Sequence, residues 1–311
     1  MTTRRLKDIH SAHELAQAVG VSESKIFEYA VSDYQEGFYE KLEIPKRGRN
    51  RKGEFREVYK ANHKWVTQLH RSVSMLVTNS ASFGTHVQGF LKGRSTLTNA
   101  ELHLRKSLIL HADIRNFFNV ITEPQVAKAF LTIGATPEIS KLLARISTID
   151  GFLRQGTRCS PIISNLVCKG LDQAMLDLAS THDCIYSRYA DNMTISGTEI
   201  PDISAISTIV KNNGFELRGS GCYIQRRGSR QFVTGLSVVD RERPRLPKKL
   251  KSRLRLAVYY ASKYGKEHFE RSRHVDTATP SWAQMKGMIA YAHSIEPDYA
   301  EKLWKLLRQS R

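Results

Sequence analysis

Residues 184–196 read CIYSRYADNMTIS, and this stretch predicts a strand, a tight turn and a second strand. Apolar and polar residues alternate on both sides of the central Ala190-Asp191 pair, which is typical of a half-buried hairpin. A second carboxylate, Asp113, follows the apolar run at residues 108–112, which predicts a buried strand. Two aspartates that are far apart in the sequence are therefore predicted to lie at the ends of strands.

These two aspartates are candidate ligands of a divalent metal ion. Mg²⁺ prefers oxygen ligands in octahedral geometry and usually binds one or two carboxylates together with substrate phosphates. Two such ions can activate a hydroxyl group and stabilise a leaving pyrophosphate in an in-line displacement. An Asp at the end of a strand is more often a turn-former, so this interpretation of Asp113 and Asp191 depends on the motifs around them.

The charge of the chain favours a polyanionic partner. Its 311 residues include 48 Lys and Arg against 30 Asp and Glu, which gives a net charge of +18. Such a surplus attracts polyanions and drives association by counterion release. Nucleic acid is the favoured partner. A membrane surface comes second, because no basic amphipathic helix supports it.

Composition indicates a globular protein of the cytoplasm. The hydrophobic fraction of 41% argues against a largely disordered chain. No run of 18 apolar residues predicts a membrane span, and the N-terminus lacks the apolar core of a signal peptide. The four cysteines lack the CxxC spacing of a zinc site, so reduced thiols are expected.

The sequence predicts many helices and few strands. Residues 9–30 predict two short helices, the first with a capping box at Ser11, and a DNA-binding helix-turn-helix is the alternative to ordinary packing. Basic residues 45–53 predict a loop or hairpin tip, and residues 55–59 predict a strand. The other predictions are helices at 65–77, 123–130, 137–146, 161–179 and 202–213, a strand at 231–238, and basic helices from residue 247.

Five motifs resemble those of one enzyme family. Tyr189-Ala190-Asp191-Asn192 resembles the YxDD box of reverse transcriptases, and residues 112–118, ADIRNFF, resemble their first catalytic box. Residues 153–165, LRQGTRCSPIISN, resemble the LPQGxxxSPxxxN segment. Residues 99–103, NAELH, and 233–235, VTG, are similar to the NAxxH and VTG boxes of retrons. Because the motifs follow in family order, the chain resembles a bacterial retron reverse transcriptase.

The resemblance implies an α+β right-hand polymerase fold, with fingers, a palm with an antiparallel sheet, and a helical thumb. It predicts an N-terminal helical extension at residues 1–40, fingers and palm at 41–240, and a basic RNA-binding thumb at 241–311. It also implies an RNA-directed DNA polymerase that uses two Mg²⁺ ions and dNTPs to copy its cognate non-coding RNA into branched RNA–DNA (msDNA). Such retrons serve in anti-phage defence, commonly with an effector protein encoded nearby.

The same resemblance assigns the catalytic roles. Asp113 and Asp191 would bridge the metal ions, with Asn192 as a further catalytic ligand and the carbonyl of Ile114 as a lesser one. Phe118 would lie under the incoming sugar, where its ring would clash with a 2′-hydroxyl and so select deoxynucleotides.

Three further residues are implied to bind the nucleotide. Gln155 and Gly156 would approach the nucleotide and the templating base, where a glycine lets backbone come close. Arg56 is a candidate for the triphosphate because guanidinium binds phosphate bidentately. Solvated surface charge is the alternative for Arg56.

Retron RNA would be bound by the two retron boxes and the thumb. RNA duplex is read largely through shape and backbone, which suits a dense basic surface. The predicted RNA-binding residues are Asn99, His103, Val233, Thr234, Gly235, Lys248, Lys249, Lys251 and Arg253. Tyr259, Tyr260 and Trp282 are candidates for base stacking, with core packing as the alternative.

The sequence also departs from the family pattern. Asn192 stands where the family has a second Asp, so this position brings no negative charge to a metal site. Gly221 stands where the family has a lysine that is a proposed acid for the pyrophosphate, and Arg154 and Arg158 replace Pro and a small residue.

Two alternatives to the polymerase remain. The first, favoured by Asn192 and Gly221, is a catalytically weakened RNA/DNA-binding scaffold that holds the retron nucleic acid and restrains an effector protein. The second, a group II intron-type maturase, has less support because the chain leaves little room for additional domains.

Overall fold

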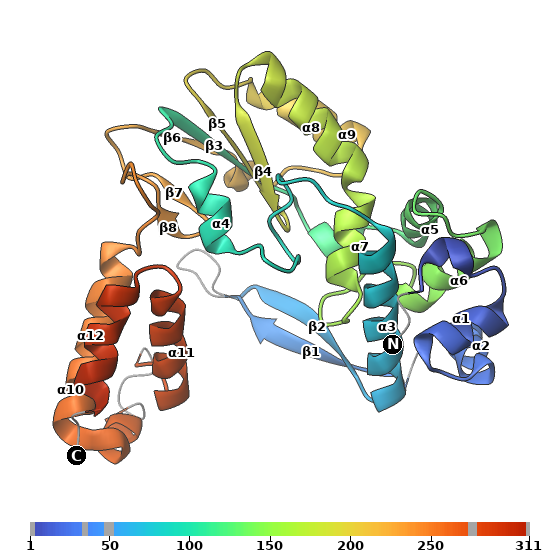
Figure 1. Ribbon diagram of the computed structural model, residues 1–311, viewed down its shortest axis with the longest axis horizontal. Helices are drawn as coiled ribbons and strands as arrows, with labels where there is room; N and C mark the ends of the chain where they lie inside the picture. The colour runs from blue at the N-terminus through green and yellow to red at the C-terminus, as the bar shows by residue number, and fades with distance from the viewer. Residues whose placement is uncertain (1–3, 33–36, 47–52, 273–278, 309–311) are drawn as a thin grey trace. The chain divides into compact units, whose positions relative to one another are not determined.

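The computed structural model describes residues 4–32, 37–46, 53–272 and 279–308 (Figure 1). Its helices are α1 (Ala12–Val19), α2 (Glu23–Val31), α3 (Lys64–Ser80), α4 (Thr96–Glu101), α5 (Glu123–Leu131), α6 (Pro137–Ser147), α7 (Ser160–Val167), α8 (Lys169–Thr181), α9 (Ile203–Asn212), α10 (Lys248–Ser272), α11 (Trp282–His293) and α12 (Pro297–Arg308). Its strands are β1 (Tyr39–Pro45), β2 (Phe55–Ala61), β3 (Leu108–Asp113), β4 (Ile185–Tyr189), β5 (Asn192–Gly197), β6 (Tyr223–Arg226), β7 (Phe232–Val233) and β8 (Leu236–Ser237). Within these ranges, no helix is both long and apolar enough to cross a membrane.

The strands form three sheets, and the chain is of mixed helix and sheet as predicted. β1 pairs with β2 in an antiparallel hairpin, and β7 pairs with β8 in the same sense. The remaining strands form a four-stranded sheet in the order β4-β5-β3-β6. β4 and β5 are joined by only two residues, so they run antiparallel, because parallel strands need a longer crossover.

Contacts between residues divide the chain into two units, each with its own apolar core. The first unit comprises Met1–Gly93, Leu110–Ile195 and Glu199–Tyr223, and the second comprises Arg94–Ile109, Ser196–Thr198 and Ile224–Arg311. In Figure 1 the second unit contains α4 and the helices α10 to α12. The division into an extension, fingers with palm, and thumb, with boundaries at residues 40 and 240, stays a prediction.

Most predicted elements are present. The two N-terminal helices are α1 and α2, and the side chain of Ser11 accepts the Glu14 N–H at the start of α1. α1 contacts α3 and α2 contacts α6, so both pack into the core of the first unit. The predicted strand at residues 55–59 is β2, whereas its partner β1 was not predicted. Most of the basic run predicted as a hairpin tip, residues 47–52, lies outside the described residues.

Two predicted elements are wrong in their extent. The helix expected at residues 161–179 is interrupted at Cys168, where ψ is 0°, and Gly170 follows with its low helix propensity. The strand expected at 231–238 is instead the β7–β8 hairpin. Thr234 and Gly235 form its turn with φ of +47° and +82°, as in a type I′ turn. A β-branched residue rarely adopts a positive φ, so the sequence did not indicate this turn.

A cluster of aromatic rings joins β1 to α2 and α3 in the first unit. The buried Tyr29 ring contacts Phe38 at 5.1 Å and Trp65 at 6.0 Å between ring centroids. His70 is 1% exposed, and its Nε2 lies 3.0 Å from the Ile146 carbonyl. Since a carbonyl only accepts, Nε2 carries the proton. Burial lowers the pKa of His70 to about 4, despite the opposing effect of the Ile146 hydrogen bond.

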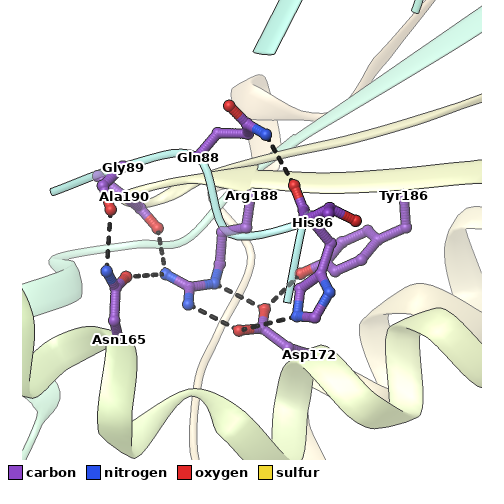
Figure 2. A network of polar contacts seen from close by, with 9 residues as sticks. His86, Gln88, Gly89, Asn165, Asp172, Tyr186, Arg188 and Ala190 are labelled. Atoms are coloured by element: carbon purple, nitrogen blue, oxygen red, sulfur yellow. Dashed lines mark hydrogen bonds and ion pairs between the residues drawn. The ribbon is translucent and has the colours of Figure 1, made fainter. Parts of the chain in front are cut away.

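A buried ion pair connects the sheet to the helices below it (Figure 2). The Arg188 side chain on β4 has no solvent exposure, and its Nε and Nη2 each donate to a carboxylate oxygen of Asp172 on α8 at 2.7 Å. The Tyr186 hydroxyl donates to the same carboxylate at 2.8 Å. The bidentate geometry and the third donor offset the desolvation of both charges.

The same arginine holds the turn between β4 and β5. Its Nη1 donates to the Ala190 carbonyl and to the Asn165 side-chain oxygen, each at 3.1 Å. The Asn165 amide donates in turn to the Gly89 carbonyl at 2.9 Å. Figure 2 shows Asn165 and Asp172 reaching the guanidinium from neighbouring helices. Ala190 has a φ of +59°, so this network fixes a turn conformation that a non-glycine residue seldom adopts.

We expect acid to destabilise the protein through His70. A histidine whose pKa is lower in the folded state contributes stability that is complete above the unfolded pKa of 6.5 and is lost as the pH falls toward about 4. His70→Gln retains a donor for Ile146 but does not titrate. Between pH 7 and 4, the wild-type free energy of unfolding should therefore fall by up to about 3 kcal/mol more than that of the variant.

Urea unfolding at a series of pH values measures this difference. His13→Gln is the matched control, because the His13 side chain is 71% exposed, and it should follow the wild type. If the free energy of unfolding changed equally with pH in the wild type and in His70→Gln, the result would contradict a neutral buried imidazole at His70.

Replacing Asp172 should destabilise the protein strongly. Asp172→Asn keeps the shape of the side chain but leaves the buried Arg188 charge without compensation. The expected loss is about 3 kcal/mol or more in free energy of unfolding. Tyr186→Phe, which removes one hydrogen bond to the same carboxylate, should cost about 1 kcal/mol. Equal losses in the two variants, measured by urea unfolding, would show that the ion pair is not the main support of the turn.

Candidate active site

A polar cavity of about 600 Å³ in the first unit brings the two aspartates together. Asp113 ends β3, and Asp191 lies in the turn between β4 and β5. The Ile114 N–H donates to the Asp191 carbonyl at 2.9 Å, which joins the two segments directly. The predicted site residues that line this cavity are Asp113, Asp191, Asn192, Phe118, Gln155 and Arg56.

The charges around the two carboxylates are mixed. Burial raises the pKa of Asp191, and the positive charges of Arg218 and Arg56 together with the Asn192 amide partly offset this. The Asn192 amide donates to Asp191 Oδ1 at 3.0 Å. Arg218 Nε lies 3.6 Å from Asp113 Oδ1. Each carboxylate therefore has a polar neighbour of its own in the cavity.

The donor set fits a divalent metal ion only together with a substrate. Within the described ranges, no group of three or more His, Cys, Asp or Glu side chains could hold a metal ion. The protein offers the two carboxylates of Asp113 and Asp191 and the amide of Asn192. Mg²⁺ sites of this kind use one or two carboxylates and take further oxygen ligands from phosphates and water, so the residues fit such a site.

Phe117 and Phe118 both line the cavity, but the Phe117 side chain belongs mainly to the core. The Phe117 side chain is 4% exposed and packs against Phe215. The half-buried Phe118 ring contacts Phe117 at 5.3 Å and Phe90 at 6.1 Å between centroids. Phe118 therefore presents an aromatic surface to whatever occupies the cavity.

The segment with Gln155 and Gly156 lies against the β1–β2 hairpin. The Gln155 carbonyl accepts the Tyr59 N–H at 2.7 Å. Gly156 has a φ of +103°, and a Cβ atom there would lie 2.3 Å from the Tyr59 carbonyl oxygen. The glycine is thus required by the close approach of a strand, and its approach to a nucleotide stays a prediction.

The NAxxH and VTG boxes pack together in the second unit. Asn99 and His103 are buried, and His103 Nδ1 lies 2.7 Å from Ser196 Oγ. The Thr234 hydroxyl donates to the Thr96 carbonyl at 2.8 Å. Val233 is also buried, and Gly235 is exposed at the turn. Most of these predicted RNA-binding residues therefore have internal contacts.

The basic residues of α10 are of two kinds. Lys248, Lys249 and Arg253 are exposed. Lys251 is instead half-buried, and its ammonium group donates to the Glu296 carboxylate. Ion pairing of this kind is a structural role, so Lys251 differs in burial from the exposed Lys248, Lys249 and Arg253.

The predicted stacking residues also divide. Tyr259 and Tyr260 are exposed on α10, at 53% and 48%. Trp282 is half-buried and packs edge-on against the buried Phe269. Core packing therefore explains Trp282, whereas the two tyrosines remain open to a ligand.

Several functional positions were missed by the sequence analysis. Arg218 and Lys46 line the cavity beside the aspartates. Asn165 and Arg188 lie within the quoted stretches at residues 153–165 and 184–196, but the sequence assigned no role to them or to Asp172. The signal in the sequence was Arg188, a charged residue inside the strand before the turn. A buried arginine requires a buried carboxylate as its partner.

Comparison with known proteins agrees with the motifs. Residues 44–228, more than half of the chain, match the family model described as "Reverse transcriptase (RNA-dependent DNA polymerase)". The chain is 27% identical to the retron Mx65 reverse transcriptase of Myxococcus xanthus over 93% of its length and 69% of the relative's. It is 29% identical to the retron Mx162 reverse transcriptase of the same species, over 94% of this chain and 65% of that one.

A third relative is the retron Ec86 reverse transcriptase of Escherichia coli, which is 29% identical over 55% of each chain. The chain thus spans between about half and two thirds of the length of these relatives. The predicted resemblance is confirmed: the chain belongs to the reverse transcriptase (RNA-dependent DNA polymerase) family, among the bacterial retron enzymes.

Proposed function

We propose that this protein is the RNA-directed DNA polymerase of a retron, which copies its cognate non-coding RNA into msDNA. The observation that carries the proposal is the cavity in which Asp113 and Asp191 lie together with Phe118, Gln155 and Arg56. Carboxylates for metal ions, a cation for phosphates and an aromatic ring for a sugar are the groups that nucleotide addition requires.

The fold that we propose is the right-hand polymerase fold. The four-stranded sheet that carries Asp113 and the β4–β5 turn would be the palm. The β1–β2 hairpin, from which Arg56 reaches the cavity, would belong to the fingers. The basic helix α10 and its neighbours α11 and α12 would form the thumb.

Each cavity residue has a proposed part in the reaction. Two Mg²⁺ ions, when bound, would supply Lewis acidity at the attacking hydroxyl and the leaving pyrophosphate. Asp113 and Asp191 would hold them, with the Asn192 amide and the Ile114 carbonyl as weaker ligands. Arg56 would bind the triphosphate as a bidentate donor.

The remaining residues would act on the nucleotide itself. The Phe118 ring would exclude a 2′-hydroxyl. Gln155 and Gly156 would border the base, with the glycine backbone already held by β2.

The proposed RNA partner is a structured non-coding RNA with its cDNA product. The net charge of +18 suits such a partner. Lys248, Lys249 and Arg253 expose their charges on α10, and Tyr259 and Tyr260 lie exposed on the same helix. Asn99 and His103 would act indirectly, by shaping the surface of the second unit, because both are buried.

A second candidate is a binding scaffold with weak catalysis. Asn192 donates its amide to Asp191 and adds no negative charge to the cavity. In this role the chain would hold the retron nucleic acid and restrain an effector protein. Both roles would serve anti-phage defence in the cytoplasm.

Replacing Asn192 with aspartate should increase DNA synthesis. Asn192→Asp adds a negative charge next to Asp191, so it should raise the affinity for Mg²⁺ and the yield of cDNA on the order of tenfold. The measurement is incorporation of labelled dNTPs on the cognate RNA, with branched RNA–DNA as the product. Asp191→Ala should abolish synthesis. Unchanged synthesis in Asp191→Ala, with thermal unfolding like that of the wild type, would refute the metal assignment.

Removing the Phe118 ring should weaken sugar discrimination. Phe118→Ala opens the cavity where a 2′-hydroxyl would lie, so the ratio of dNTP to rNTP incorporation should fall by at least about tenfold, a change of about 1.4 kcal/mol in discrimination. Phe90→Ala is the control, because the exposed Phe90 touches Phe118 but does not line the cavity. An unchanged ratio in Phe118→Ala would show that the ring only packs against Phe117.

A further inference from the structure

Arg218 lies beside the candidate metal ligands, and the proposed polymerase reaction assigns no part to it. Its Nε is 3.6 Å from Asp113 Oδ1, and it lines the same cavity as Asp191. We propose that Arg218 is an exchangeable counter-ion: it pairs with Asp113 in the metal-free cavity, yields this carboxylate to a divalent cation, and then binds the nucleotide phosphates. The inference rests on the proposed polymerase site and adds a phosphate-binding residue to it.

The backbone of Arg218 is fixed at the end of β3. Leu217 forms an antiparallel bridge with Ile114, and the Arg218 N–H donates to the Asp113 carbonyl at 2.8 Å. The Gly221 N–H closes a turn by donating to the Arg218 carbonyl at 2.8 Å. The backbone therefore holds the guanidinium at the cavity from a defined position, with the side chain 26% exposed.

Gly221 provides the space for this pair. A Cβ atom at position 221 would lie 2.7 Å from Asp113 Cβ and 3.3 Å from Arg218 Cβ. Any side chain there would push Asp113 or Arg218 aside. Gly221, which departs from the family pattern, is thus the residue that lets Arg218 and Asp113 lie next to each other.

The exchange follows from the chemistry of the groups. The planar donors of an arginine guanidinium match carboxylate and phosphate equally well. A divalent cation and a guanidinium carry like charges and compete for the same carboxylate, so a bound metal ion weakens the pair between Arg218 and Asp113. The nearest anions would then be the phosphates of a nucleotide in the cavity, which Arg56 and Lys46 also line.

The first test measures metal binding without nucleic acid. Arg218→Gln removes the competing charge, so the affinity for Mn²⁺, followed by electron paramagnetic resonance, should rise by about tenfold, the factor expected for one close ion pair near a surface. Arg115→Gln is the matched control: its arginine is a neighbour in sequence of Ile114, is 63% exposed, pairs with Glu216 and does not line the cavity. This control should bind Mn²⁺ like the wild type.

The second test measures nucleotide binding on annealed oligo(dT) and poly(rA), with Ca²⁺ in place of Mg²⁺. Arg218→Gln should weaken dTTP binding at least fivefold, in the direction opposite to its effect on Mn²⁺. Arg218→Lys keeps the charge, so its Mn²⁺ affinity should stay near the wild-type value and its dTTP affinity should recover in part. Circular dichroism and urea unfolding establish that each variant is folded.

Three outcomes would overturn the proposal. Unchanged or weaker Mn²⁺ binding in Arg218→Gln would exclude the counter-ion, and unchanged dTTP binding would exclude the phosphate contact. If Arg115→Gln changed Mn²⁺ and dTTP binding as much as Arg218→Gln does, a general effect of surface charge would explain both results. Failure of the polymerase assignment has a different signature, because a wild type that binds no dTTP at all would still report the Mn²⁺ difference.

Discussion

The site depends on a charged pair that water does not reach. Arg188 and Asp172 are almost completely buried, and burying two charges costs free energy unless geometry and further hydrogen bonds compensate. Here every nitrogen of the guanidinium donates: Nε and Nη2 bind Asp172, and Nη1 binds the Asn165 side chain and the Ala190 carbonyl. The turn that carries Asp191 is therefore attached to two helices at once, which is why it can hold an unusual backbone conformation.

This network also explains which parts of the fold the sequence predicts. Regular periodicity and capping residues are local, so α1, α3, α5 and the β4–β5 hairpin follow from short windows. The Arg188–Asp172 pair joins β4 to α8, and no spacing rule marks it. The break at Cys168 and the turn at Thr234 are missed for a similar reason, since contacts from elsewhere, such as the Thr96 carbonyl for Thr234, select a conformation that local preference disfavours.

The candidate site shows the same division. Asp113, Asp191, Phe118 and Gln155 could be predicted because each belongs to a motif whose letters name a chemical role, and the structure brings them into one cavity. Gly156 was predicted with a different reason, since the observed close approach is to the backbone of Tyr59. Arg218 could not be predicted, because its place is set by a backbone bridge next to it and by the close approach that Gly221 allows without a Cβ atom.

Two of the departures from the family pattern, Asn192 and Gly221, act on one quantity, the charge balance of the cavity. With Asn192 in place of an aspartate, the carboxylates that face a metal ion are Asp113 and Asp191, and Arg218 already neutralises the first of them. Arg56 and Lys46 add positive charge to the same lining, and Glu57 adds negative charge, so its three cations and three carboxylates balance. A lining with balanced charge attracts neither phosphates nor divalent cations strongly when each is considered alone. A metal ion therefore gains most when phosphates enter with it, because they supply oxygen ligands and give Arg218 an alternative anion. Metal and nucleotide should therefore bind cooperatively in this chain.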